Sequence, residues 1–124
     1  VCFAGDGDFQ MNCQELGTAM QAGARPIVLI LNNGIYGTIR AHQERQYPGR
    51  VVGTTMTFNP DFVGLAKSYG LHAEKVEETM DFPAAFRRAA QSPTGALLEL
   101  TISPEAITPR QTLSGIREAA LANV

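Results

Sequence analysis

The chain has 124 residues, of which 44% are hydrophobic and 18% charged, and this composition is typical of one compact globular domain. A formal net charge of −2 provides no broad basic field, so nucleic acid is not a favoured partner. Cys2 and Cys13 lack the spacing of a zinc site or a disulfide scaffold, which favours a cytoplasmic protein. No apolar run reaches the roughly 20 residues that span a bilayer, so we expect a soluble protein without membrane contact.

The first expected elements are a strand, a tight turn and a helix. The apolar run Val1–Ala4 stops at Gly5-Asp6-Gly7. Gly23 suits a helix C-cap and Pro26 lies just beyond it, so the helix is expected to end near Ala22. The residues that recur at helical spacing, and that we expect in the core, are Phe9, Cys13, Leu16 and Met20.

A second strand and a long irregular segment follow. Residues 27–31 are large and apolar, a run too short for a buried helix and typical of a parallel strand covered on both faces. This strand ends at Asn32-Asn33-Gly34. No periodicity is sustained from Ile35 to Phe58, which predicts a loop containing a short helix near residues 36–43.

The next helix and strand are marked by a cap, an apolar face and a glycine. Asn59 is expected to cap a helix that has Pro60 in its first turn and ends at Gly70. A short strand over residues 72–76 follows. The expected buried face of the helix comprises Phe62, Leu65, Ala66 and Tyr69.

One more helix and strand precede a C-terminal tail. Thr79 or Asp81 is expected to cap a helix that tolerates Pro83 in its first turn. A strand over residues 96–102 follows, and residues 104–124 form a tail with a weak helical pattern through Leu113, Ile116 and Ala120. The expected buried face of the helix comprises Phe82, Ala85, Phe86, Ala89 and Ala90.

Strands that alternate with helices in this way predict an α/β fold. The expected architecture is an open, mostly parallel sheet with helices on both faces, because right-handed βαβ crossovers place helices there. Residues 1–103 are expected to form one domain, followed by the tail. Because the chain starts inside a strand, we expect a fragment truncated at its N-terminus.

Two polar motifs are expected at the ligand-binding edge of this sheet. Ligands of open α/β sheets collect at the carboxyl ends of strands, where Gly5-Asp6-Gly7 and Asn32-Asn33 lie. The two glycines permit close approach of the backbone to an anion, and the following helix N-terminus favours phosphate. A carboxylate in this position requires a cation between it and the phosphate. Mg²⁺ suits carboxylate, amide and phosphate oxygens, so Asp6 and Asn33 are the expected ligands.

The first motif is also found in other kinds of site. Gly-Asp-Gly alone is usually a plain turn, and only its pairing with Asn33, 27 positions later, makes it specific. A dinucleotide fingerprint would need glycine in place of Gln10, and a calcium loop would need it in place of Met11. A non-catalytic anion-binding module and a regulator phosphorylated on Asp6 stay open as alternatives.

The segment GDGDFQMNCQELGTAMQAGARPIVLILNN at residues 5–33 resembles the cofactor signature of thiamine-diphosphate enzymes. The likeness covers nearly the whole chain, including NPDF at residues 59–62, and FQMNCQEL looks especially like acetolactate synthases. It implies a thiamine-diphosphate-binding fold, Mg²⁺ ligands at Asp6, Asn33 and the Ile35 carbonyl, and Gly5 beside the diphosphate. The diphosphate contacts that it implies are Gly7, Asp8, Phe9, Tyr36 and Gly37.

The resemblance also implies an activity. It indicates a transferase or lyase acting on pyruvate or another 2-oxo acid, with a decarboxylase of the same superfamily as the alternative. A homo-dimer or homo-tetramer is implied, in which a partner subunit supplies the catalytic glutamate, so no catalytic residue is assigned here and the chain alone is expected to be inactive. Asp8, Thr38 and His42 depart from the serine, methionine and tryptophan common in acetolactate synthases, which weakens the substrate assignment.

Several other polar residues have an ordinary structural interpretation. The loop basic residues are more often solvated than ligand-binding, and His72 is expected to be a plain strand-end histidine. Glu15 is expected to be solvated or to pack on its helix. Glu99 interrupts an apolar strand and is either a buried acid with a partner or a wet strand end. The loop residues in question are Arg40, His42, Arg45 and Arg50.

Overall fold

The computed structural model describes residues 1–123, which form two compact units. Unit 1 comprises Val1–Asn32 and Asn59–Thr101, and unit 2 comprises Asn33–Phe58 and the segment from Ile102 onward. The expected domain boundary after residue 103 stays a prediction. Within residues 1–123, no helix has the length and apolar character that crossing a bilayer requires.

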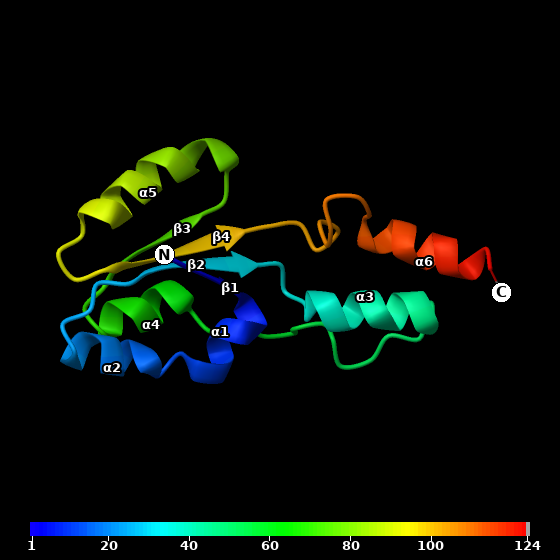
Figure 1. Cartoon of the computed structure of the whole chain (residues 1–124), viewed down its shortest axis with the longest axis horizontal. Coiled ribbons are helices and arrows are strands. Elements are labelled where there is room, and N and C mark those ends of the chain that lie inside the picture. Colours follow the sequence, from blue (N-terminus) through cyan, green and yellow to red (C-terminus); the bar gives the residue numbers. More distant parts are fainter. Residues whose placement is uncertain (124) are drawn as a thin grey trace. The chain divides into compact units, whose positions relative to one another are not determined.

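Unit 1 is built on a four-stranded parallel sheet with the strand order β1-β2-β4-β3 (Figure 1). Every pair of neighbouring strands is parallel, which confirms the expected α/β class. The strands are β1 (Cys2–Gly5), β2 (Ile27–Asn32), β3 (His72–Val76) and β4 (Ala96–Thr101). Their positions agree with the apolar runs in the sequence.

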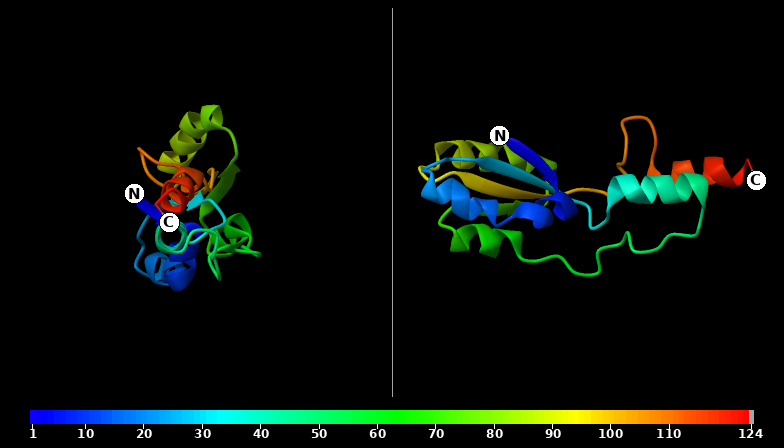
Figure 2. Two further views of the ribbon diagram at one scale, coloured as in Figure 1. Left: turned by 90° about the vertical axis from the view of Figure 1, so that its right-hand side faces the viewer. Right: turned by 60° about the horizontal axis from the view of Figure 1, so that its bottom comes forward.

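Helices cover both faces of this sheet (Figures 1 and 2). On β2, Val28 and Ile30 enter the core beneath one group of helices, whereas Leu29 enters the core on the opposite face, because successive side chains of a strand alternate. The first face carries α1 (Asp6–Asn12), α2 (Glu15–Gln21) and α4 (Phe62–Ser68), and the second carries α5 (Phe82–Gln91). Burial on both sides explains why the strand is continuously apolar.

The strand register brings two polar strand ends to the same edge of the sheet. β1 and β2 are direct neighbours, and Gly5 lies opposite Leu31. Asp6 and Asn32 are the next residues of the two strands, so they lie at the same edge. On the other side of β2, Asn32 lies opposite Thr101 of β4. The carboxyl ends of β1, β2 and β4 therefore meet at one edge, as the alternation of strands and helices predicted.

The first helix differs from the expectation. It begins at Asp6, directly after β1, and consists of α1 and α2 instead of one continuous helix. Cys13 and Gln14 between them keep right-handed helical angles (φ −58° and −63°), so the chain is distorted there without reversing direction. The end at Ala22 is confirmed, and Gly23 adopts a φ of 65° after it. Cys13 and Met20 are partly buried and pack against the core, as expected.

The predicted cap of α4 was wrong. The N-cap is Asp61, whose Oδ1 accepts a hydrogen bond of 2.8 Å from the main-chain N–H of Gly64. Asn59 lies two residues before this cap, so its side chain is available for other contacts. The physical reason is spacing, since a capping side chain reaches the amide three residues ahead of it.

Helix α5 starts at one of the two expected caps, but its buried face differs from the expectation. Thr79 begins a short 3₁₀ turn, η1 (Thr79–Asp81), and Asp81 is the N-cap of α5 but makes no capping bond through its side chain. Ala85 and Ala89 are buried as expected, whereas Ala90 is exposed. The apolar face is thus narrower than the sequence pattern indicated.

Unit 2 contains two helices that lie side by side, α3 (Gly37–Gln46) and α6 (Leu113–Leu121) (Figure 1). The short helix expected near residues 36–43 is confirmed and is longer than predicted. An antiparallel bridge joins Ile35 to Thr55, so the segment after α3 returns to the segment before it. The buried core of the unit consists of Ile35, Ala41, Leu113 and Ile116, with Ile107 packed against it.

Candidate functional site

Asp6 is a buried acid at the ligand-binding edge of unit 1. Its residue is 1% exposed, and Oδ2 accepts a hydrogen bond of 2.8 Å from Asn59 Nδ2. Gln10 Nε2 donates to the main-chain oxygen of Asp6 at 3.2 Å. The Asp6 carboxylate is therefore held by a side chain from the segment that precedes α4, whereas Gln10 of its own helix binds the main chain of Asp6.

The contact between Asp6 and Asn59 is one end of a longer hydrogen-bonded chain, which we call the amide relay and which comprises Asp6, Asn59, Asn32 and Glu99. Asn59 Nδ2 also donates to Asn32 Oδ1 at 3.2 Å, and Asn32 Nδ2 donates to Glu99 Oε1 at 2.8 Å. Glu99 is 8% exposed. Of the two interpretations left open for Glu99, the structure therefore selects the buried acid with a partner.

Sequence reasoning assigned neither Asn59 nor Asn32 to the site. The signal that identifies Asn59 is the pair of polar residues around Pro60: Asp61 is correctly placed to cap α4, which leaves Asn59 without that role. Asn32 directly precedes Asn33, and of the two the cofactor signature assigns a ligand role to Asn33 alone. No local pattern predicts that Asn32 contacts Glu99, which is 67 positions away.

The glycines and acids around Asp6 have separate roles. The Asp8 carboxylate accepts a hydrogen bond of 3.1 Å from the main-chain N–H of Gly5, so it turns back to the start of α1. A Cβ on Gly5 would lie 3.0 Å from Asp8 Oδ2, so glycine permits this close approach. Asp8 thus uses its side chain as a cap, the arrangement that lets an acid lie near a phosphate site.

Gly7 and Phe9 are both buried. The ring of Phe9 packs edge-on against Phe62 with centroids 5.8 Å apart, which ties α1 to α4 in the core. A ligand contact from Phe9 would therefore come from its main chain. The predicted contacts of Gly5, Gly7, Asp8 and Phe9 with a diphosphate stay predictions.

In unit 2, the turn that carries Asn33 is held by hydrogen bonds on both sides. Asn33 Oδ1 accepts a bond of 3.2 Å from the Ile35 N–H, an Asx turn across Gly34. The neighbouring segment pairs with this turn: the Tyr36 N–H donates to the Thr54 carbonyl at 3.0 Å, and the Met56 N–H donates to the Gly34 carbonyl at 2.8 Å. The turn is thus an ordered part of unit 2.

Gly37 begins α3 and lies close to this turn. A Cβ at Gly37 would lie 3.3 Å from Ile107 Cδ1 and 3.5 Å from Asn33 Nδ2. A Cβ here would make an ordinary contact with Asn33 and would be slightly too close to Ile107. The absence of a side chain therefore lets the tail residue Ile107 pack closely against the start of α3.

The predicted site residues fall into two groups. Gly5, Asp6, Gly7, Asp8 and Phe9 belong to unit 1, whereas Asn33, Ile35, Tyr36 and Gly37 belong to unit 2. Each group is brought together within its own unit. That Asp6 and Asn33 share one ion stays a prediction. Among residues 1–123, no three His, Cys, Asp or Glu side chains are grouped so that they could hold a metal ion.

Arg40 and Glu44 belong to the scaffold of unit 2. Glu44 is fully buried and accepts hydrogen bonds from Arg40 Nε at 3.1 Å, from Arg117 Nε at 2.8 Å and from the Gly49 N–H at 3.3 Å. The Arg117 hydrogen bonds are the largest cause that lowers the pKa of Glu44, to about 2, from its usual 4.5. Arg40 therefore has a structural role, whereas His42, Arg45 and Arg50 are exposed.

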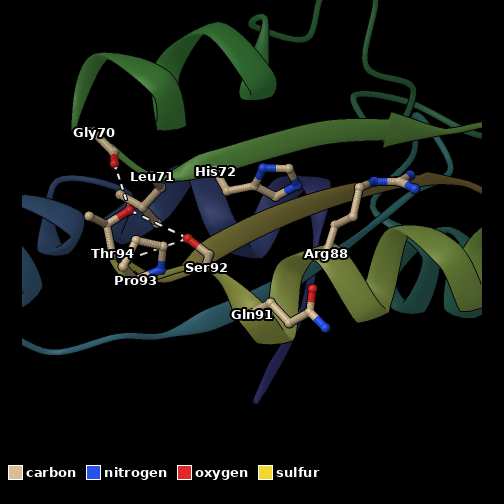
Figure 3. A pocket seen from close by; sticks show the side chains of 8 residues that line it. All are labelled: Gly70, Leu71, His72, Arg88, Gln91, Ser92, Pro93 and Thr94. Atoms are coloured by element: carbon tan, nitrogen blue, oxygen red, sulfur yellow. Dashed lines mark hydrogen bonds between the residues drawn. The ribbon is translucent and has the colours of Figure 1, made fainter.

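A separate hollow of about 420 Å³ lies where β3 and β4 begin (Figure 3). Thr94 Oγ1 donates a hydrogen bond of 2.8 Å to the Gly70 carbonyl. Arg88 Nη2 donates a hydrogen bond of 2.6 Å to Glu74 Oε2. Arg88 lowers the pKa of Glu74 to about 2, with a smaller effect from His72. Because this hollow lies at the amino ends of the parallel strands, it is distinct from the edge that carries Asp6.

A family model described as "Thiamine pyrophosphate enzyme, C-terminal TPP binding domain" matches residues 1–100. The chain belongs to this family. The matched segment contains Asp6, the amide relay and all the residues expected to contact the cofactor. The thiamine-diphosphate-binding fold expected from the sequence is therefore confirmed, and membership of the family implies thiamine diphosphate as the cofactor.

Known relatives of this thiamine pyrophosphate domain include acetolactate synthases. The chain is 32% identical over 123 residues to a probable acetolactate synthase large subunit of Methanococcus aeolicus, covering 96% of this chain and 20% of the relative. It is 35% identical over 102 residues to the large subunit of acetolactate synthase isozyme 2 of Escherichia coli (strain K12), covering 82% of this chain and 19% of the relative.

A solved structure shows the same fold. The thiamine diphosphate-dependent 4-hydroxybenzoylformate decarboxylase of Rhodococcus jostii RHA1 matches with a TM-score of 0.74 and 31% sequence identity, covering 82% of this chain and 19% of that protein. The thiamine pyrophosphate domain thus spans about a fifth of the length of these relatives. Its likeness to acetolactate synthases is distant and partial.

Proposed function

We propose that this chain holds the diphosphate of thiamine diphosphate through Mg²⁺ in an acetolactate-synthase-like enzyme. In this proposal, the Mg²⁺ ligands are the Asp6 carboxylate, the Asn33 amide oxygen and the Ile35 carbonyl. Diphosphate oxygens and water complete the octahedral coordination that this ion prefers. The main chain of the first and second motifs contacts the diphosphate at Gly5, Gly7, Asp8, Phe9, Tyr36 and Gly37.

The observation that carries this proposal is the buried carboxylate of Asp6 at the carboxyl edge of the sheet, in a chain that belongs to a thiamine pyrophosphate family. Burial of a carboxylate is costly unless hydrogen bonds or a cation compensate it. Asn59 supplies one hydrogen bond. A diphosphate at the same edge would repel Asp6, and a divalent cation between the two anions converts this repulsion into attraction.

The chemistry of the second group of residues suits the same ion. Asn33 offers an oxygen donor on an ordered turn, and the Ile35 carbonyl belongs to that turn. Carboxylate, amide and carbonyl oxygens are hard donors, which Mg²⁺ prefers over nitrogen or sulfur. Gly37 lies beside Asn33, where a Cβ would be 3.5 Å from Asn33 Nδ2.

The proposed role of these residues is binding and orientation. When bound, thiamine diphosphate supplies an electron sink for cleavage or formation of a bond next to a carbonyl group. Asp6, Asn33 and Ile35 neutralise and fix the diphosphate end, and this fixes the position of the reactive ring. The catalytic glutamate is proposed to come from a partner subunit of a cytoplasmic homo-dimer or homo-tetramer, so the isolated chain is expected to be inactive.

The proposed substrate class is 2-oxo acids, with pyruvate first, because the relatives include acetolactate synthases. The fold match to a decarboxylase supports the alternative, a 2-oxo acid decarboxylase. Supplying pyruvate and other 2-oxo acids to the full-length protein and measuring acetolactate against aldehyde separates the two. Acetolactate as the main product supports the synthase, and aldehyde alone supports the decarboxylase.

The test of cofactor binding is a titration of the full-length protein with thiamine diphosphate, with and without Mg²⁺. We expect binding that depends on Mg²⁺ and that Asp6→Ala and Asn33→Ala each weaken by about 100-fold, since each removes a direct ligand. Asp81→Ala, which removes an exposed acid at the start of α5, is the control and should bind as the wild type does.

Equally tight binding in a metal chelator would contradict the magnesium site. It would favour the non-catalytic anion-binding module instead. Phosphorylation of Asp6 in place of cofactor binding would favour the regulator. Isothermal titration calorimetry distinguishes these outcomes because it measures affinity without relying on turnover.

A further inference from the structure

The amide relay is directional. An amide both donates and accepts hydrogen bonds, whereas a carboxylate only accepts. Because Asn32 Nδ2 lies 2.8 Å from Glu99 Oε1, the amino end of Asn32 faces Glu99 and its oxygen faces Asn59. The amino group of Asn59 then faces both acceptors, Asn32 and Asp6. Glu99 therefore sets the orientation of the Asn32 amide, and the oxygens of Asn32 and Asp6 together set the orientation of the Asn59 amide.

A second contact holds Asn59 in the same orientation. Gln10 Nε2 donates to Asn59 Oδ1 at 3.0 Å. If the Asn59 amide were flipped, its amino group would face the amino group of Gln10, and its oxygen would face the oxygens of Asn32 and Asp6. The flipped state would thus replace these hydrogen bonds with repulsive contacts, so Asn59 has a single favourable orientation.

We propose that Asn59, oriented by Glu99 through Asn32, is a positioning residue that fixes the Asp6 carboxylate for magnesium binding. This inference rests on the function proposed above. Asn59 binds Oδ2 of Asp6 and so restricts rotation of the carboxylate about its own axis. A more restricted carboxylate suits the near-ideal octahedral geometry of Mg²⁺, whereas a less restricted one suits Ca²⁺, which accepts bidentate carboxylates and variable geometry.

The consequence is a change in metal preference as well as in affinity. Loss of a residue that orients a metal ligand typically weakens metal binding by about 10–100-fold. Asn59→Ala removes the hydrogen bond but no ligand. We therefore expect Mg²⁺ binding to fall by about 10-fold or more, with a smaller loss for Ca²⁺.

The experiment measures the Mg²⁺ and Ca²⁺ concentrations that half-saturate thiamine-diphosphate binding by the full-length protein. In Asn59→Ala, the half-saturating Mg²⁺ concentration should rise and the preference for Mg²⁺ over Ca²⁺ should fall. Glu99→Gln should change the half-saturating Mg²⁺ concentration and the metal preference in the same direction as Asn59→Ala, but by less. A glutamine amide can present either of its ends to Asn32. The double variant should show less than the sum of the two effects, since both act through one chain of hydrogen bonds.

Asp61→Ala is the matched control, because it removes the α4 cap two residues from Asn59 and makes no contact within the amide relay. It should lower the melting temperature and leave the metal preference unchanged. Wild-type metal preference in Asn59→Ala would overturn the inference, and if Asn59→Ala fails to fold, the nearly isosteric Asn59→Leu, which also cannot donate to Asp6, decides instead. Wild-type protein that binds no thiamine diphosphate with either ion would instead overturn the proposed function, and this inference with it.

Discussion

At the scale of single residues, the turn before α3 depends on a backbone conformation that only glycine adopts readily. Gly34 has a φ of 68°, and it lies between Asn33 and Ile35, the two residues joined by the Asx turn. A Cβ at Gly34 would meet open space, so crowding is not the constraint. The constraint is the positive φ itself, which costs other residues about 1–2 kcal/mol.

We predict that Gly34→Ala weakens cofactor binding as well as stability. Its matched control is Gly53→Ala, because Gly53 has a φ of 67° and also faces open space. Both variants should lose about 1 kcal/mol of unfolding free energy in urea titrations. Only Gly34→Ala should also weaken Mg²⁺-dependent thiamine-diphosphate binding, and equal affinity in the two variants would argue against a role for this turn in the site.

At the scale of helices and strands, one buried acid joins the helices of unit 2. Glu44 on α3 accepts hydrogen bonds from Arg117 on α6, from Arg40 one turn earlier and from the Gly49 N–H. Ile35 packs with Leu113 and Ile116 in the same unit. Docking of α6 on α3 therefore stabilises the helix that begins beside the Asn33 turn.

We predict that Arg117→Met destabilises unit 2 by about 2 kcal/mol, because it leaves a buried carboxylate with fewer donors. Hydrogen exchange of the α3 and α6 amides should become faster, while exchange in the β2 and β4 core should change little. Arg45→Met is the control, since Arg45 is an exposed arginine on α3. Equal exchange in both variants would show that the ion pair contributes no stability.

At the scale of the whole molecule, two acids link stability to pH, one in each unit. Arg117 and Arg88 lower the pKa values of Glu44 and Glu74, respectively, from 4.5 to about 2 in the folded state. An acid whose pKa is lowered by folding stabilises the protein above its unfolded pKa. This contribution is lost as the pH falls through the folded value, because the unfolded state binds the proton first.

We predict that the contribution of these two acids to the unfolding free energy is constant above about pH 5. It should decrease steadily as the pH falls from about 4.5 to 2. Urea titrations at a series of pH values measure it. Glu74→Gln removes one titrating group and should make this acid-induced decrease shallower. An unchanged slope in that variant would contradict the role assigned to the contact between Glu74 and Arg88.

The sequence by itself determined the secondary structure and the family. The apolar runs of β2 and β4 and the glycines after α2 and α4 are local signals, because strand burial and positive φ values act over a few residues. The cofactor signature is likewise read from consecutive residues. One error, the cap of α4, concerns the choice between two nearby polar residues, Asn59 and Asp61, that are both common as helix caps.

Only the tertiary structure decided which polar side chains meet. Asp6 and Asn59 are 53 positions apart, and Asn32 and Glu99 are 67 positions apart. Asn32 and Glu99 meet because the strand order β1-β2-β4-β3 places β4 beside β2, and Asp6 and Asn59 meet because α1 and α4 pack into one core on the same face of the sheet. Side-chain hydrogen bonds act over about 3 Å, so their partners depend on this order of strands, which local periodicity does not specify.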